Sequence, residues 1–175
     1  MVLRKINAGF SLLSTILLLD HAIFHAAWML SGCTIPKTAT VSRVLLGVMM
    51  IHAVISILLA FLGHKGAEKR PCNSYPKLNM ATNIQRASGL SLILLSALHI
   101  LGATGIMQPP QLVHAIVPPL FFTIALAHAA ISTGKAFITL GIGSAKFVKI
   151  LDIGMRVVCV ATLIADIVGF YLYVC

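Results

Sequence analysis

Apolar runs of roughly 20 residues recur along almost the whole chain, and short stretches rich in turn-forming and basic residues separate them. A run of this length, folded as an α-helix, crosses a hydrocarbon core of roughly 30 Å. The pattern predicts five transmembrane helices, at residues 7–32, 40–63, 83–105, 111–137 and 148–174. Turn residues at 32–36, 71–76, 109–110 and 141–144 mark the gaps between them. The expected fold is therefore an all-α integral membrane protein with a single transmembrane domain over residues 1–175.

The composition agrees with a chain that lies in the bilayer. Its 175 residues are 59% hydrophobic and 10% charged, and the mean hydropathy of +1.00 lies far above that of an ordinary soluble domain. These values exclude a water-soluble single-core domain and leave little chain for a separate soluble catalytic domain. Aromatic residues do not alternate with the basic ones, so nucleic acid is not an expected partner.

The distribution of basic residues predicts the orientation in the membrane. The chain has 13 Lys and Arg against 4 Asp and Glu. One side receives most of them, namely Arg4, Lys5, Lys65, Lys69, Arg70, Lys77, Arg86, Lys135, Lys146 and Lys149. The opposite side receives only Lys37 and Arg43. By the positive-inside rule we expect the N-terminus in the cytoplasm and the C-terminus outside. The expected location is a prokaryotic cytoplasmic membrane, in which the chain is a multi-pass protein.

A cleaved targeting segment is the alternative interpretation of the first apolar run. Arg4 and Lys5 precede the run, and residues 30–33 resemble a bacterial lipoprotein cleavage box. The run is longer than a signal-peptide core of about 7–15 residues, and it contains Asp20, His21 and His25. We therefore expect a retained helix.

Histidines in the apolar runs are the strongest candidates for chemistry. An ionisable side chain in lipid is costly, so it usually has a partner or a cofactor. At 1.5 Å per residue, His52 and His128 lie at an inner level, roughly 10–16 Å from the basic ends of their spans. His21, His25 and His99 lie at an outer level, at roughly 21–27 Å. Two stacked bis-histidine haems inside a bundle of the first four helices need this arrangement, although each histidine alone is also compatible with a hydrogen-bonded core residue.

Small and basic residues fit the same hypothesis. Gly89, Ser96 and His99 share one helical stripe, which leaves room for a flat macrocycle or for close packing of two helices. Haem propionates need cationic donors, and Arg86 and Lys135 lie toward the basic side, where an inner haem could use them. The same two residues are also typical of charged anchors at the membrane surface. Arg156 has Asp152 four residues before it, so an ion pair along one helix is expected.

Residues 84–89, Ile-Gln-Arg-Ala-Ser-Gly, followed by His99, resemble a motif of a known family. This motif, Gln-x-x-Thr/Ser-Gly with a histidine ten residues after the glycine, is similar to that of the single-chain, five-helix dihaem cytochrome b anchor of succinate:quinone oxidoreductases and quinol:fumarate reductases. His52 and His128 resemble the ligands of the second and fourth helices, and the last helix lacks histidine, as in the family. The resemblance extends over nearly the whole chain.

The resemblance implies the ligands and the partners. His21 and His99 would ligate the distal haem b, with His25 as an open alternative to His21, and His52 and His128 the proximal haem b. The chain would pass electrons between a membrane quinone, menaquinone or another, and an iron–sulfur subunit and flavoprotein on the cytoplasmic face. Dicarboxylate chemistry would take place on the flavoprotein, so this chain would supply only the haems and the quinone site. The basic segments 65–77 and 135–149 would offer a docking surface, or serve only as topology signals.

Quinone chemistry also requires residues that handle protons, because two-electron reduction takes up two protons. Candidates on the outer side are His25, Trp28, Arg43, His114 and Asp166. Some family members carry a glutamate two residues before the fourth-helix ligand, as part of a proton path, whereas this chain has Leu126 there. Coupling of electron flow to proton movement stays open, as do the direction of catalysis and the oligomeric state, including a homodimer of the complex.

Two other functions are compatible with the sequence. One is a b-type cytochrome subunit of another membrane oxidoreductase, with ligands on fewer helices. The other is a haem-free membrane scaffold or small transporter, in which the histidines bond one another or relay protons. The chain shows neither an inverted repeat nor paired broken helices, which disfavours a transporter.

Overall fold

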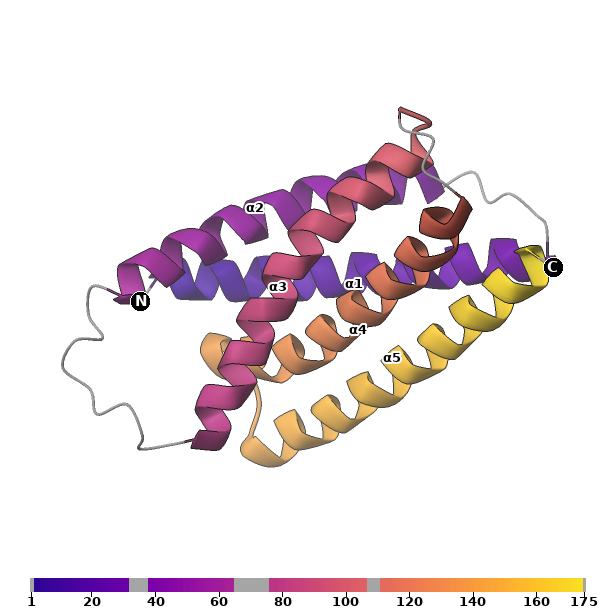
Figure 1. Ribbon diagram of the computed structural model, residues 1–175. Coiled ribbons are helices and arrows are strands. Elements are labelled where there is room, and N and C mark those ends of the chain that lie inside the picture. The colour runs from indigo at the N-terminus through magenta and orange to yellow at the C-terminus, as the bar shows by residue number, and fades with distance from the viewer. Residues whose placement is uncertain (1, 32–37, 65–75, 107–110, 175) are drawn as a thin grey trace.

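Five long helices make up the protein in the computed structural model, which describes residues 2–31, 38–64, 76–106 and 111–174 (Figure 1). They are α1 (Val2–Ser31), α2 (Thr38–His64), α3 (Pro76–Ala103), α4 (Gln111–Leu140) and α5 (Ala145–Val174). No strand occurs in these described ranges. Each helix contains a segment long and apolar enough to cross a membrane. The prediction of an all-α chain with five helices that are long and apolar enough to span a membrane is confirmed.

Two helices begin earlier than the apolar pattern predicts. α1 starts at Val2 rather than at residue 7, and α3 starts at Pro76 rather than at 83. Hydrophobicity marks the part of a helix that lies in lipid, whereas helical hydrogen bonds continue through polar residues beyond it. Most of the turns predicted at 32–36, 71–76 and 109–110 lies outside the described residues, apart from Pro76, which opens α3.

The two helices at the centre of the bundle are α1 and α4. α1 packs against α2, α4 and α5, and α4 also packs against α3 and α5 (Figure 1). Leu18 and Ala22 of α1 meet Phe122 and Leu126 of α4 in the core. α5 therefore packs directly on the same two helices that form the centre.

Small side chains allow α4 to occupy this central place. Ala125, Ala129 and Ala130 are buried, and such residues let neighbouring helix backbones approach closely in a membrane. Pro118 and Pro119 lie inside the helix, which continues through both of them.

A four-residue turn joins α4 to α5. Gly141 adopts a φ of +74°, and the amides of Gly141 and Ile142 bond the carbonyls of Ile138 and Phe137, at 3.1 Å each. This is a Schellman C-cap, which needs a residue that tolerates a positive φ. Ser144 then caps α5, because its Oγ accepts the amide of Phe147 at 3.3 Å. The predicted turn at 141–144 is confirmed.

Candidate functional site

The side chain of His128, on α4, is anchored by a residue of the motif on α3. Ser88 Oγ lies 2.8 Å from His128 Nδ1. The same hydroxyl lies 3.1 Å from the Gln85 carbonyl oxygen, to which it can donate its only hydrogen. With the hydrogen on that carbonyl, the hydroxyl accepts from Nδ1–H of His128, and Nε2 keeps a free lone pair. This is the tautomer that an imidazole needs when it ligates a metal through Nε2.

Gly89 makes room for the same ring. A Cβ built at residue 89 would lie 3.2 Å from His128 Cε1, tighter than ordinary van der Waals contact. The absence of a side chain therefore lets the imidazole lie against the backbone of α3.

Gln85 connects the two helices at the next turn. Its Nε2 donates to Ser132 Oγ at 3.1 Å, and Lys135 Nζ donates to its Oε1 at 2.7 Å. Three residues of α3 therefore face α4. Ser88 and Gly89 lie beside His128, and Gln85 lies beside Ser132 and Lys135, which follow His128 by one to two turns. Arg86 points away, because successive helical residues are about 100° apart, and its side chain is exposed. Of the two candidates for haem propionates, only Lys135 joins this cluster.

His52 of α2 lies in electrostatic range of His128. The backbone of Asn7 lies beside its imidazole, and Nδ1 is buried without a hydrogen-bond partner. A buried polar atom without a partner is costly, particularly in lipid. A haem iron would bind the other nitrogen, Nε2, so Nδ1 would still need its own partner, and it is the nearness of His52 to His128 that makes it a candidate ligand.

The helices that carry each proposed ligand pair do not pack closely on one another. Among the described residues, α2 does not pack closely on α4, and α1 does not pack closely on α3. A haem between two histidines needs such a separation, because each Fe–N bond takes up about 2.0 Å and the imidazoles add their own length. The arrangement of helices is thus compatible with both proposed pairs.

At the outer level, three histidines surround one buried aromatic side chain. Phe122, 2% exposed, has its ring centroid 6.3 Å from that of His21, 5.2 Å from that of His25 and 6.1 Å from that of His99. His99 also stacks on Phe121, at 4.9 Å between centroids. A haem at this level would have to share the space with Phe122, so the outer pair fits a macrocycle less readily than the inner pair does.

His21 and His25 have different partners. His21 Nδ1 lies 3.1 Å from Ser42 Oγ on α2, whereas His25 Nδ1 lies 3.3 Å from Asp166 Oδ1 on α5. Each contact occupies Nδ1 and leaves Nε2 as the nitrogen that can meet a metal. Geometry alone therefore leaves both histidines as candidates for the outer ligand.

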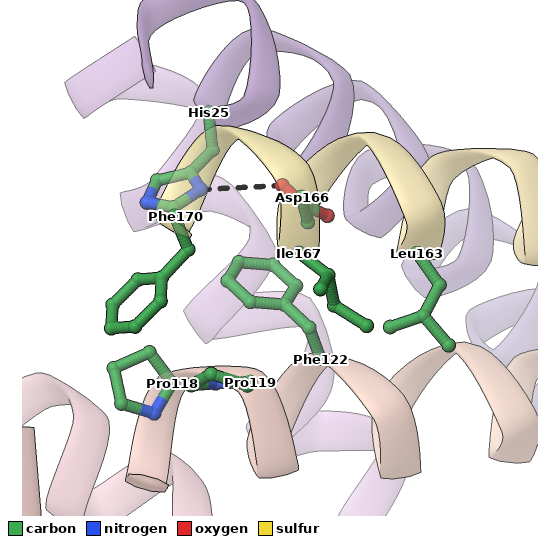
Figure 2. Close-up of a pocket in the computed structure, with 8 residues that line it drawn as sticks. All are labelled: His25, Pro118, Pro119, Phe122, Leu163, Asp166, Ile167 and Phe170. Carbon is green, nitrogen blue, oxygen red and sulfur yellow. Dashed lines mark hydrogen bonds and ion pairs between the residues drawn. The ribbon is translucent and has the colours of Figure 1, made fainter. Parts of the chain in front are cut away.

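The pair His25–Asp166 borders a small cavity between α1, α4 and α5 (Figure 2). Pro118, Phe122 and Phe170 line it on the apolar side, and its volume of about 10 Å³ holds about one water. Asp166 is 5% exposed, and its Oδ2 has no hydrogen-bond partner. A water in the cavity could bond this oxygen, but the space is too small for a quinone ring.

The remaining quinone candidates are less closely grouped. The Trp28 ring lies 5.9 Å from that of His25, between centroids. Arg43 is exposed on α2, and the side chain of His114 lies outside the described residues. The structure therefore brings His25, Trp28 and Asp166 together, and no contact of Arg43 with them is described.

Two further expectations from the sequence have clear outcomes. Arg156 Nη2 lies 2.8 Å from Asp152 Oδ2, so the predicted ion pair within one helix is confirmed. Leu126, where a glutamate would stand in some relatives of the resembled family, is 1% exposed in the core.

Within the part of the chain that the structure describes, no three or more His, Cys, Asp or Glu side chains gather as a metal site. An axially ligated haem needs only two. Comparison with protein-family models, with curated protein sequences and with solved structures found no match to this chain. The assignment of function therefore depends on the residues and their geometry.

The sequence pattern did not single out three residues that contribute to these clusters, namely Phe122, Ser42 and Asn7. Phe122 is one of several apolar residues in α4, and nothing in its sequence context marks it as the centre of the histidine cluster. Asn7 accepts a hydrogen bond from Ser56 on α2 at 3.2 Å. Polar residues at 7, 14 and 21 recur every seventh position on α1, which is the signal that could have indicated a polar face toward α2.

Proposed function

We propose that the chain is the membrane anchor and electron-transfer subunit of a succinate dehydrogenase or fumarate reductase complex. Two b-type haems would lie in the bundle, one between His52 and His128 and the other between His99 and His21, with His25 as the alternative to His21. Electrons would pass between a membrane quinone and an iron–sulfur and flavoprotein pair at the basic end of the helices.

The arrangement around His128 is the observation that supports this proposal best. The motif Gln85-x-x-Ser88-Gly89 anchors Nδ1 of His128, leaves room for the ring and connects α3 to Lys135. When the protein holds Nδ1, Nε2 is the nitrogen that a metal would bind. A fixed Nδ1–H with a free Nε2 lone pair is typical of a ligating histidine.

The residues of the inner site have separate roles in this proposal. A bound haem would supply one-electron redox chemistry, which amino-acid side chains at this place do not. Ser88 would hold the His128 ring through Nδ1, and His52 would offer its imidazole from α2. Lys135, held by Gln85, provides a positive charge toward the basic end, where a propionate needs a donor.

For the quinone site, the proposal names a group of residues but no binding position. His25, Trp28 and Asp166 are the best-placed groups, because they lie together at the outer level. Since the cavity beside them is about 10 Å³, a quinone would bind against the outer surface of this cluster or displace the side chains that line it.

A second candidate is a b-type cytochrome subunit of another membrane oxidoreductase, with one haem. Phe122 favours it, because this buried ring lies in contact with every histidine of the outer level. In that case the outer histidines would be core residues around an aromatic side chain.

Haem counting and spectroscopy test the proposal. We expect about two b-type haems per chain, with low-spin bis-histidine bands in the reduced-minus-oxidised spectrum of the purified complex. We also expect succinate dehydrogenase or fumarate reductase subunits to purify with it. One haem per chain would favour the second candidate. No haem, in a preparation shown to retain its cofactors, would overturn both.

Single variants then assign the ligands. His52→Ala and His128→Ala should each remove the same haem signal, and His99→Ala should remove the other. His21→Ala should match His99→Ala, whereas His25→Ala should leave both signals in place. If His25→Ala removes the outer signal and His21→Ala does not, His25 is the ligand.

A further inference from the structure

A hollow of about 700 Å³ opens between the end of α4 and the beginning of α5. Its walls combine three cationic side chains, one carboxylate and several aliphatic residues. The charged residues are Lys135, Lys149, Asp152 and Arg156. The aliphatic ones include Ile131, Ile138 and Val148. The volume is within the usual range of ligand sites, roughly 300–1,000 Å³.

The hollow lies at the level where the apolar part of the bundle ends. α5 is apolar from Val157 to its end at Val174, apart from Asp166, and this segment rises about 27 Å. That length is close to the thickness of the hydrocarbon core, so Arg156 lies at its boundary. On α4, Lys135 likewise follows a long apolar segment. Both cations therefore lie at the depth of lipid headgroups.

Contacts within the protein hold two of the cations in place, and these cations keep N–H donors that a ligand can use. Lys135 Nζ is held by Gln85 Oε1 at 2.7 Å, and Arg156 by Asp152 at 2.8 Å. The pair with Asp152 uses one edge of a guanidinium that has five N–H donors, and the Arg156 side chain is 64% exposed. Lys149 is exposed at the rim. Three positive charges against one negative charge leave the hollow with an excess of two.

We propose that this hollow binds the phosphate headgroup of an anionic phospholipid. The cations would bind the phosphate oxygens, and the aliphatic wall would contact the glycerol and the first acyl carbons. A lipid fits better than a soluble protein, because most of the lining lies within the candidate membrane spans of α4 and α5 and the rest lies in the turn that joins them. It fits better than free phosphate, because the wall is partly aliphatic. This site shares Lys135 with the cluster around His128, but Lys149 and Arg156 lie outside that cluster, and lipid binding there does not depend on any haem.

Lipid titration of the full chain, purified with the subunits it retains, tests the proposal. The affinity for phosphatidylglycerol is measured by native mass spectrometry, with phosphatidylcholine and inorganic phosphate as comparison ligands. In the double variant Lys149→Gln/Arg156→Gln we expect roughly 30-fold weaker phosphatidylglycerol binding, about 2 kcal/mol at about 1 kcal/mol per basic residue. Phosphatidylcholine and inorganic phosphate should bind the natural chain much more weakly than phosphatidylglycerol does.

A matched control removes the same charges elsewhere. Arg4 and Lys5 are exposed at the same end of the bundle, on α1 and away from the hollow. The variant Arg4→Gln/Lys5→Gln should keep its phosphatidylglycerol affinity within about twofold. The charge-keeping variant Lys149→Arg/Arg156→Lys should also retain most of it. The single variant Lys149→Gln, at an exposed position, should lose roughly fivefold, and it serves if the double variant fails to fold.

Three results would overturn the proposal. An equal loss in the control would mean that the bundle end attracts anionic lipid only by its overall charge. Equal binding of inorganic phosphate would indicate a free-anion site. If the double variant kept its lipid affinity but lost the soluble subunits, the hollow would be a surface for docking protein.

Discussion

The hydroxyl of Ser88 has one hydrogen, and its direction decides the chemistry of His128. When this hydrogen goes to the Gln85 carbonyl, the hydroxyl accepts from Nδ1, and Nε2 of His128 is free to bind a metal. The control over the tautomer comes from a different helix, so it depends on the register between α3 and α4.

Ser88→Ala should weaken haem binding at His128 by 10–100-fold, the usual cost of losing the partner that orients a ligating histidine. The titration of haem into the haem-free protein measures it. Ser91→Ala is the matched control, because Ser91 is exposed on the same helix and bonds only its own helix, at the carbonyl of Ala87. Equal effects of the two variants would contradict a role for Ser88 in positioning the ring.

Gly89→Ala should disturb the inner site alone, because the new methyl group would lie 3.2 Å from His128 Cε1. We expect a changed midpoint potential or the loss of one of the two haem signals, seen in a redox titration followed by absorbance. Gly102→Ala on the same helix meets no atom within 4 Å and should leave both signals unchanged. A Gly89→Ala protein with natural spectra and potentials would refute this packing argument.

The sequence singled out most of the polar residues of the two clusters but not their contacts. His25 and Asp166 each appeared costly in lipid, yet they are 141 positions apart, and periodicity within one helix contains no information on such a pair. The role of Phe122 was not predicted, for a different reason. An apolar side chain in an apolar helix is unremarkable until the fold places three histidines around it.

At the scale of elements, the short connection between α4 and α5 was the easiest to predict and is the most specific in geometry. Gly141 and Ser144 have the residue types that a C-cap and an N-cap prefer, and both caps form. The first residues of α1 and α3 were harder to predict, because the part of a helix that extends from the lipid into water has no apolar pattern to mark it.

Gly141→Ala should destabilise the protein by about 1–2 kcal/mol, because φ at this position is +74° and alanine resists a left-handed conformation. Unfolding in mixtures of a mild detergent and dodecyl sulfate measures the change. Gly154→Ala, inside α5 with no atom within 4 Å of the new Cβ, is the control and should be neutral or slightly stabilising. A neutral Gly141→Ala would contradict the importance of the cap.

For the whole molecule, the basic residues predict the orientation, and an odd number of helices places the two ends on opposite sides. α1 begins at the same end of the bundle at which α4 ends and α5 begins (Figure 1). Arg4, Lys5, Lys146 and Lys149 belong to that end.

We therefore expect a reporter that works only outside the cytoplasm, such as alkaline phosphatase, to be active when fused after residue 174 and inactive when fused after residue 144. A green fluorescent protein at the same two positions should give the opposite pattern. The reverse result would mean that the chain has the opposite orientation and that soluble subunits would dock on the other face. Equal signals at both sites would indicate mixed insertion.

The apolar pattern was sufficient for the number of helices and for their type, but not for which helices touch. Hydrophobicity drives a helix into lipid and then no longer distinguishes its neighbours, since lipid tails are as apolar as leucine. Small residues and rare polar pairs select the neighbours instead. α1 owes its central place to contacts with three other helices, including Ser56 of α2 and Asp166 of α5.

This central place of α1 has a consequence for how the chain is synthesised. Asp166, the partner of His25, is made 141 residues later, which takes roughly 7–30 s at about 5–20 residues per second. During that time the nascent first helix lies in the bilayer with this imidazole still lacking its carboxylate. Ser42, only 21 residues after His21, arrives within a few seconds. The contact between α1 and α2 can therefore form before any contact with α5, and the ribosome must reach α5 before His25 gains its carboxylate partner.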